Sequence, residues 1–122
     1  MSIIADNIHR VRGRISEACV SAQRPVQSVT LLVVSKTFGA DAVREAHAAG
    51  ERHFGENYVQ EGVDKIAALA DLRDAIEWHL IGPLQSNKTR IVAEQFDWVH
   101  SVERLKIAQR LSDQRPPRLP PL

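Results

Sequence analysis

Val29-Thr30-Leu31-Leu32-Val33-Val34-Ser35 is a short apolar run rich in β-branched residues, and Lys36 follows it directly. Such a run is typical of a buried strand in a parallel sheet. A lysine at the end of that strand has its stem fixed by the scaffold, so its amine can be desolvated and become a nucleophile towards aldehydes. Position alone leaves a second interpretation open, in which Lys36 is a solvated residue that begins a loop.

The rest of the chain alternates helical and strand patterns. Apolar residues three and four positions apart predict a first helix over residues 2–23, which Pro25 ends. We then expect four strands, each followed by a helix. The strands are predicted at residues 29–35, 52–54, 77–81 and 97–99, and the helices contain residues 43–46, 59–70, 86–94 and 105–111.

This order, α-(β-α)4, predicts an α/β fold with a parallel sheet. Four β-α units are half of a TIM-type (β/α)8 barrel, which typically needs about 250 residues. We therefore expect residues 1–122 to form a single partial domain, the N-terminal half of such a barrel. Its unpaired strand edges can pair with another copy, so self-association of the fragment is expected. A compact four-stranded domain in its own right is the alternative.

Four residues lie in the loops that follow the predicted strands: Lys36, Asn57, Gly82 and Ser101. Crossover connections place all strand-to-helix loops at the carboxyl ends of the strands, where ligands bind in open sheets and in barrels. We therefore expect these four residues to share one face. Helix capping is an alternative role for two of them. Asn57 with Gln60 has the spacing of a capping box, and capping is the favoured interpretation of Ser101.

The composition argues against several functions. Sixteen Lys and Arg against fifteen Asp and Glu give a formal net charge of +1, without the basic excess of a nucleic-acid-binding protein. No run reaches the roughly 18 apolar residues that span a bilayer, and the five histidines show no metal-ligand spacing. Cys19 is the only cysteine. We expect it to be buried and reduced, in a cytoplasmic protein without nucleic-acid or membrane partners.

Three blocks of sequence occur in order along the chain: Leu32-Val33-Val34-Ser35-Lys36-Thr37, then Phe54-Gly55-Glu56-Asn57-Tyr58-Val59-Gln60-Glu61, then Glu77-Trp78-His79-Leu80-Ile81-Gly82-Pro83-Leu84-Gln85-Ser86-Asn87-Lys88. Together they resemble the pyridoxal phosphate homeostasis protein family, a relative of the alanine racemase N-terminal barrel. The resemblance covers essentially the whole chain. It implies a single-domain barrel that binds pyridoxal 5′-phosphate (PLP) as an internal aldimine on a lysine.

The resemblance also assigns roles to individual residues. Lys36 matches the lysine of the family's Ser-Lys motif, and Asn57 matches an asparagine near the cofactor. His79 and Ser101 are further candidates for the cofactor site. For His79, a hydrogen-bonded interior ring is favoured over an acid–base catalyst. Gly39 stands where many relatives have proline, which predicts a looser loop after Lys36. The phosphate-binding loops of such barrels follow the late strands, beyond these four.

The resemblance implies a carrier that buffers PLP in vitamin B6 and amino-acid homeostasis, without a defined catalytic turnover. PLP-dependent apoenzymes are the partners that such a carrier would supply. One alternative is a PLP-dependent amino-acid racemase, which needs acid–base groups on both faces of its substrate and therefore a second domain. The other alternative is a truncated interaction module without cofactor, to which the proline-rich residues 116–121 would contribute.

Overall fold

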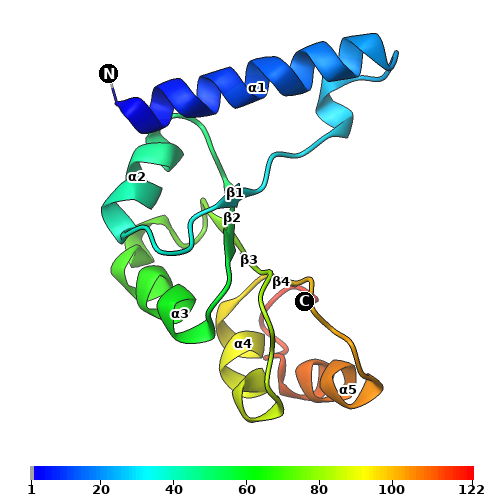
Figure 1. Ribbon diagram of the computed structural model, residues 1–122. Helices are drawn as coiled ribbons and strands as arrows, with labels where there is room; N and C mark the ends of the chain where they lie inside the picture. The colour runs from blue at the N-terminus through cyan, green and yellow to red at the C-terminus, as the bar shows by residue number, and fades with distance from the viewer. Residues whose placement is uncertain (1) are drawn as a thin grey trace.

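The computed structural model describes residues 2–122, with helices packed against one four-stranded parallel sheet (Figure 1). The predicted α/β class and the predicted order of elements are confirmed. The strands are β1 (Val33–Val34), β2 (His53–Glu56), β3 (Glu77–Leu80) and β4 (Trp98–Val99). The helices are α1 (Ile3–Ser21), α2 (Ala40–Ala48), α3 (Val59–Ala68), α4 (Thr89–Gln95) and α5 (Leu105–Gln114), and short 3-10 turns lie at Val26–Ser28, Ala70–Leu72 and Ser86–Lys88.

The strands lie in the order in which they occur along the chain, and every neighbouring pair is parallel. This is how consecutive strands are arranged in a TIM-type barrel. Helices α2, α3 and α4 follow one side of the sheet in Figure 1, and we call this side the helix face. The other side, the open face, carries exposed side chains such as Val34 and Trp98, which are 46% and 54% exposed.

The hydrophobic core lies between the helix face and the helices. Successive residues of a strand point to opposite faces, so residues paired in register form rows across the sheet. Phe54 is paired with Trp78, and both are buried on the helix face. Trp78 therefore packs against the helices. Trp98, by contrast, is paired with His79 and shares the open face with it.

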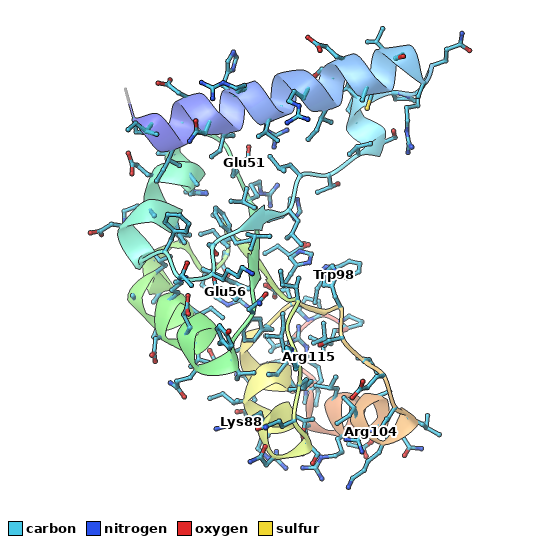
Figure 2. The ribbon with its side chains drawn as sticks, viewed as in Figure 1. Glu51, Glu56, Lys88, Trp98, Arg104 and Arg115 are labelled. Atoms are coloured by element: carbon cyan, nitrogen blue, oxygen red, sulfur yellow. The ribbon has the colours of Figure 1, made fainter. Side chains whose placement is uncertain are left out.

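Helix α1 begins where the sequence predicts, because Ser2 caps it by accepting a hydrogen bond from Ala5 N at 2.9 Å. A bidentate ion pair ties the middle of α1 to the body of the molecule. Arg12 donates through Nε and Nη2 to the buried carboxylate of Glu51 at 2.5 and 2.8 Å. Glu51 is labelled below α1 in Figure 2. Cys19 is buried, as predicted. Among residues 2–122, no helix is both long enough and apolar enough to cross a membrane.

Several elements are shorter than predicted, and for β1 and α4 the structure gives the reason. Strand β1 covers Val33–Val34 rather than residues 29–35, because its only neighbour, β2, begins at His53 and pairs Phe54 with Val33. The residues before Leu32 thus extend past the end of the partner strand. Helix α4 begins at Thr89 rather than at residue 86, because Ser86–Lys88 form a tighter 3-10 turn.

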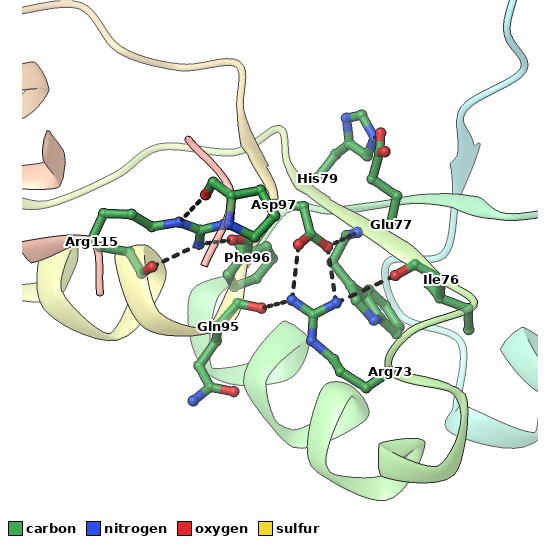
Figure 3. Close-up of polar contacts among 11 residues, drawn as sticks. Arg73, Ile76, Glu77, His79, Gln95, Phe96, Asp97 and Arg115 are labelled. Carbon is green, nitrogen blue, oxygen red and sulfur yellow. Dashed lines mark hydrogen bonds and ion pairs between the residues drawn. The ribbon is translucent and has the colours of Figure 1, made fainter. Parts of the chain in front are cut away.

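Arginine side chains hold the amino ends of β3 and β4 together (Figure 3). The guanidinium of Arg73 donates to both carboxylate oxygens of Asp97 at 2.9 and 3.1 Å. Asp97 also accepts Trp78 N at 2.8 Å, and this contact fixes β4 beside β3. Arg115 of the C-terminal segment donates to the Phe96 carbonyl at 2.6 Å. These contacts stabilise the amino end of the sheet, opposite the carboxyl end at which ligands bind in parallel folds.

Candidate functional site

Lys36 lies immediately beyond the carboxyl end of β1, and its side chain is exposed. Within residues 2–122, its Nζ makes no hydrogen bond or ion pair. The chain has three other lysines. Lys65 is buried and paired with carboxylates, whereas Lys88 and Lys106 are exposed. Lys36 is thus the lysine that combines a free amine with a position at the tip of a parallel strand.

The loop after Lys36 has an unusual backbone. Thr37 has a φ of 65°, in the left-handed region that β-branched residues rarely adopt. Its N–H donates to Glu61 Oε1 on α3 at 2.5 Å, and its Oγ1 donates to the Lys36 carbonyl at 2.5 Å. The turn at Lys36 is therefore anchored to a helix. Gly39 occupies the N-cap position of α2 and makes no side-chain cap. The looser loop expected from this glycine stays a prediction.

Asn57 occupies on β2 the position that Lys36 occupies on β1, two residues beyond the last paired residues of the two strands. It is half-buried, and its side-chain amide makes no hydrogen bond within residues 2–122. The carbonyl of Asn57 lies so close to Gly82 that a Cβ added at Gly82 would be 1.9 Å from the carbonyl oxygen. The capping role considered for Asn57 is wrong, because α3 begins after Tyr58 and has no side-chain cap.

Ser101, in the loop after β4, is hydrogen-bonded to Gly82 in the loop after β3. Its Oγ donates to the carbonyl oxygen of Gly82 at 2.6 Å. The capping role favoured for Ser101 is therefore wrong, and α5 begins only at Leu105 without a side-chain cap. Ser101 and His100 line a cavity of ≈ 920 Å³ between the loops that follow β3 and β4.

The expected common face is present, but the four residues do not form one pocket. The parallel ladder continues one residue past the strands, since Ile81 N donates to Glu56 O and His100 N donates to Leu80 O, both at 2.9 Å. Gly82 is the meeting point, because the Asn57 carbonyl and the Ser101 hydroxyl both contact it. Lys36 lies outside the cavity that Ser101 lines.

His79 lies on the open face as a hydrogen-bonded interior ring, which confirms the favoured interpretation. Its Nε2 is 2.9 Å from Glu77 Oε1, and its Nδ1 is 2.9 Å from His100 Nε2. The Trp98 indole stacks on the ring, with centroids 5.5 Å apart and planes 10° apart. Burial lowers the pKa of His79, although Glu77 acts in the opposite direction. A neutral ring donates through Nε2 to Glu77 and accepts through Nδ1 from His100.

The parallel register brings a second histidine to the same carboxylate. His53 is paired with Glu77 across β2 and β3, and its Nδ1 lies 3.2 Å from Glu77 Oε1. One ligand atom each from His53, Glu77 and His79 lies within 4.8 Å of the others. Two histidines and a glutamate are a set of zinc-ligand types, which the linear spacing of the histidines did not indicate. Here the rings are satisfied by the shared Glu77 oxygen and, for His79, by His100.

A buried charged cluster next to Lys36 was missed from the sequence. Glu56, Glu61 and Lys65 form it, and we call it the Lys65 cluster. Lys65 Nζ lies 3.0 and 3.1 Å from the two Glu56 oxygens, 2.9 Å from Glu61 Oε1 and 2.5 Å from the Ser35 carbonyl. Burial raises the pKa of Glu56, while Lys65 lowers the pKa of Glu61. The available signals were the i, i+4 spacing of Glu61 and Lys65 and the inward position of Glu56 on β2.

Comparisons with known proteins follow the same motifs. No protein-family model matches the chain. The chain is 65% identical over 122 residues to the pyridoxal phosphate homeostasis protein of Pseudomonas aeruginosa, covering 100% of this chain and 52% of the relative. It is 58% identical over 123 residues to the protein of that name from Escherichia coli, covering 100% of this chain and 53% of the relative. The chain spans about half the length of these curated relatives.

Solved structures share the fold. PipY of Synechococcus elongatus, solved with PLP bound, has a TM-score of 0.70 and 52% identity, and the match covers 82% of this chain and 47% of PipY. A protein of unknown function from Bifidobacterium adolescentis has a TM-score of 0.84 and 36% identity, with 91% of this chain and 49% of that chain covered. The resemblance inferred from the three motifs is confirmed: the whole chain is similar in sequence to the pyridoxal phosphate homeostasis protein family, spans about half of its relatives' length, and matches the fold of PipY over 82% of its residues.

Proposed function

We propose that this chain belongs to a PLP-binding protein that carries or buffers the cofactor through a Schiff base at Lys36. The observation that carries the proposal is the free, exposed amine of Lys36 at the tip of a parallel strand. Relatives named for pyridoxal phosphate homeostasis and the PLP-bound structure of PipY support it. A role in vitamin B6 and amino-acid homeostasis, with delivery to PLP-dependent apoenzymes, is part of the same proposal.

The residues present fit the cofactor. PLP supplies an aldehyde, which an unprotonated primary amine can hold reversibly. Lys36 offers that amine, and the unpartnered amide of Asn57 sits at the equivalent position on the next strand. The Ser101 hydroxyl donates its hydrogen bond to the Gly82 carbonyl oxygen, so it would act towards a ligand as an acceptor. Both nitrogens of His79 are engaged, so His79 would contribute a wall of the site rather than a proton.

A carrier needs less chemistry than a racemase. Racemisation requires a proton donor and acceptor placed on opposite faces of the substrate carbon. The imidazoles of His79 and His100 are hydrogen-bonded to each other, and His79 also to Glu77. This arrangement supports the binding function, in which Lys36 holds the aldehyde and these two histidines are engaged with each other.

The proposal is tested by trapping the bound cofactor. Residues 1–122 and a polypeptide extended to the length of the relatives are each incubated with PLP, reduced with borohydride and mapped by peptide mass spectrometry. The pyridoxyl group should be found on Lys36, and Lys36→Ala should abolish it. Lys88→Ala is the matched control, since Lys88 is also exposed but lies at the end of the 3-10 turn Ser86–Lys88 rather than at a strand tip. Stable labelling of Lys88 or Lys106 instead, or none at all, would overturn the assignment.

A further inference from the structure

The two peptide neighbours of Lys36 are both held by the Lys65 cluster. On one side, the Ser35 carbonyl accepts Lys65 Nζ at 2.5 Å, and the Ser35 hydroxyl donates to the Glu56 carboxylate. On the other side, Thr37 N–H donates to Glu61 Oε1 at 2.5 Å. Lys36 therefore stands between two anchored residues, while its own amine stays free.

The hydrogen bonds from the Lys65 cluster hold the backbone at Thr37 in a conformation that is unfavourable by itself. The left-handed conformation of Thr37 is unfavourable for a β-branched residue, and such conformations persist only where the surroundings over-determine them. Glu61 supplies that constraint, because its Oε1 receives both the Thr37 amide and the Lys65 ammonium. Without Glu61, the Thr37 amide has no partner among residues 2–122, and the turn can relax to a commoner conformation.

Core stability alone is a weak reason for the Lys65 cluster. The side chains of Lys65 and Glu56 are 6% and 0% exposed, so both charges are almost completely removed from water. A buried ion pair is often no more stabilising than well-packed apolar residues of similar volume. What the charges provide, and apolar side chains would not, is a set of directed contacts to the backbone on both sides of Lys36.

We propose that Glu61 and Lys65, supported by Glu56, are positioning residues that clamp the turn at Lys36 and fix the direction in which its amine leaves the sheet. The inference rests on the proposed role of Lys36 in holding PLP. A fixed stem reduces the conformational freedom that the amine loses when it meets the aldehyde, and so speeds capture. Lys65 itself holds no cofactor in this scheme.

Glu61 is the member of the cluster that can be changed without unpairing a buried charge. Its side chain is 30% exposed, and in Glu61→Ala the Lys65 ammonium keeps Glu56 as its partner. Glu61→Gln retains an oxygen that can accept both the Thr37 amide and the Lys65 ammonium. Asp64→Ala is the matched control on the same helix, because Asp64 contacts Gln60 and not the turn.

The test uses the same two polypeptides and has two readouts. The first is the rate of borohydride-trapped labelling of Lys36 by PLP, with Lys88 and Lys106 as internal references. Glu61→Ala should slow it about tenfold, the size expected for one lost hydrogen bond to a charged group, and Glu61→Gln should restore it. The second is hydrogen exchange of the Thr37 amide without PLP, which Glu61→Ala should accelerate. Asp64→Ala should change neither.

Each outcome bears on a different statement. If the parent labels at Lys36 and Glu61→Ala labels equally fast, the positioning role is overturned while the proposed function stands. If the parent protein is not labelled at Lys36, the proposed function fails. If hydrogen exchange of the Thr37 amide is also unchanged in Glu61→Ala, the proposal that Glu61 holds the turn is overturned as well. Slower labelling accompanied by loss of cooperative unfolding in Glu61→Ala would show a structural role only and would also overturn the positioning role.

Discussion

Gly82→Ala should be among the most damaging single substitutions in this chain. An alanine Cβ at this position would lie 1.9, 2.7 and 2.8 Å from the oxygen, carbonyl carbon and Cα of Asn57. All three are backbone atoms, so no side-chain rotation can relieve the overlap. The ends of β2 and β3 must instead separate by about 1 Å, which a close-packed interior resists.

The magnitude follows from what the separation disturbs. Forcing an extra methyl group into a packed site typically costs about 1–3 kcal/mol. The ladder bond from Ile81 N to Glu56 O at 2.9 Å and the bond from Ser101 Oγ to Gly82 O at 2.6 Å are stretched as well, and each contributes about 1 kcal/mol net. We therefore expect the free energy of unfolding to fall by about 3–5 kcal/mol.

Urea unfolding followed by far-ultraviolet circular dichroism measures this loss, with all variants at one protein concentration. With a slope of about 2 kcal/mol per molar urea, the midpoint should fall by roughly 1.5–2.5 M, or folding should be lost. Gly13→Ala is the matched control, since a Cβ there meets nothing within 4 Å in the middle of α1. It should raise stability by about 0.5–1 kcal/mol. A Gly82→Ala midpoint equal to that of Gly13→Ala would refute the reasoning.

Three further predictions concern the pH dependence of stability, self-association and catalysis. Lowering the pH from about 7.5 to about 5.5 should destabilise the fold, because burial lowers the pKa of His79 and the unfolded chain, with a histidine pKa of about 6.5, takes up the proton first. His79→Gln should reduce this pH dependence of the urea midpoint, and an unchanged dependence would contradict the assignment. Residues 1–122 should self-associate through exposed apolar side chains and unpaired edges, and Trp98→Lys should weaken the association in sedimentation velocity, whereas a parent that stays monomeric at all concentrations would contradict it. The extended polypeptide with PLP should exchange the α-proton of L-alanine slowly in deuterated water, since each well-placed proton-transfer group contributes about 10²–10⁴-fold, and racemase-like turnover abolished by Lys36→Ala would favour the enzyme alternative.

The architecture could be predicted because it depends on local patterns. A β-branched run marked the first strand, short apolar or aromatic runs between helical patterns marked the other three, and apolar residues three and four apart marked the helices. Parallel crossovers then placed Lys36, Asn57 and Ser101 at one end of the sheet without any knowledge of the register. The predicted helix caps were wrong for two reasons: α3 begins after Tyr58 rather than after Asn57, and the Ser101 hydroxyl donates to the Gly82 carbonyl while α5 begins only at Leu105.

The charged and aromatic contacts could not be predicted, because they depend on which residues the strands bring opposite one another. His53 and Glu77 are 24 positions apart in sequence, and only the β2–β3 register makes them neighbours. The Lys65 cluster likewise forms only because the Glu56 side chain points towards α3. That direction depends on the alternation of successive side chains of β2 between the two faces of the sheet. A shift of one residue would place Glu56 on the open face instead.

The stacked pair of Trp98 and His79 gives the molecule an optical signal of its own. Trp78 is 1% exposed and Trp98 is 54% exposed, so the two indoles emit from a dry and a wet environment. The Trp98 ring lies 5.5 Å from the His79 imidazole and 6.3 Å from that of His100. The red-shifted part of the emission therefore comes from Trp98 and reports on the open face, whereas the blue-shifted part comes from Trp78 and reports on the packing of the core.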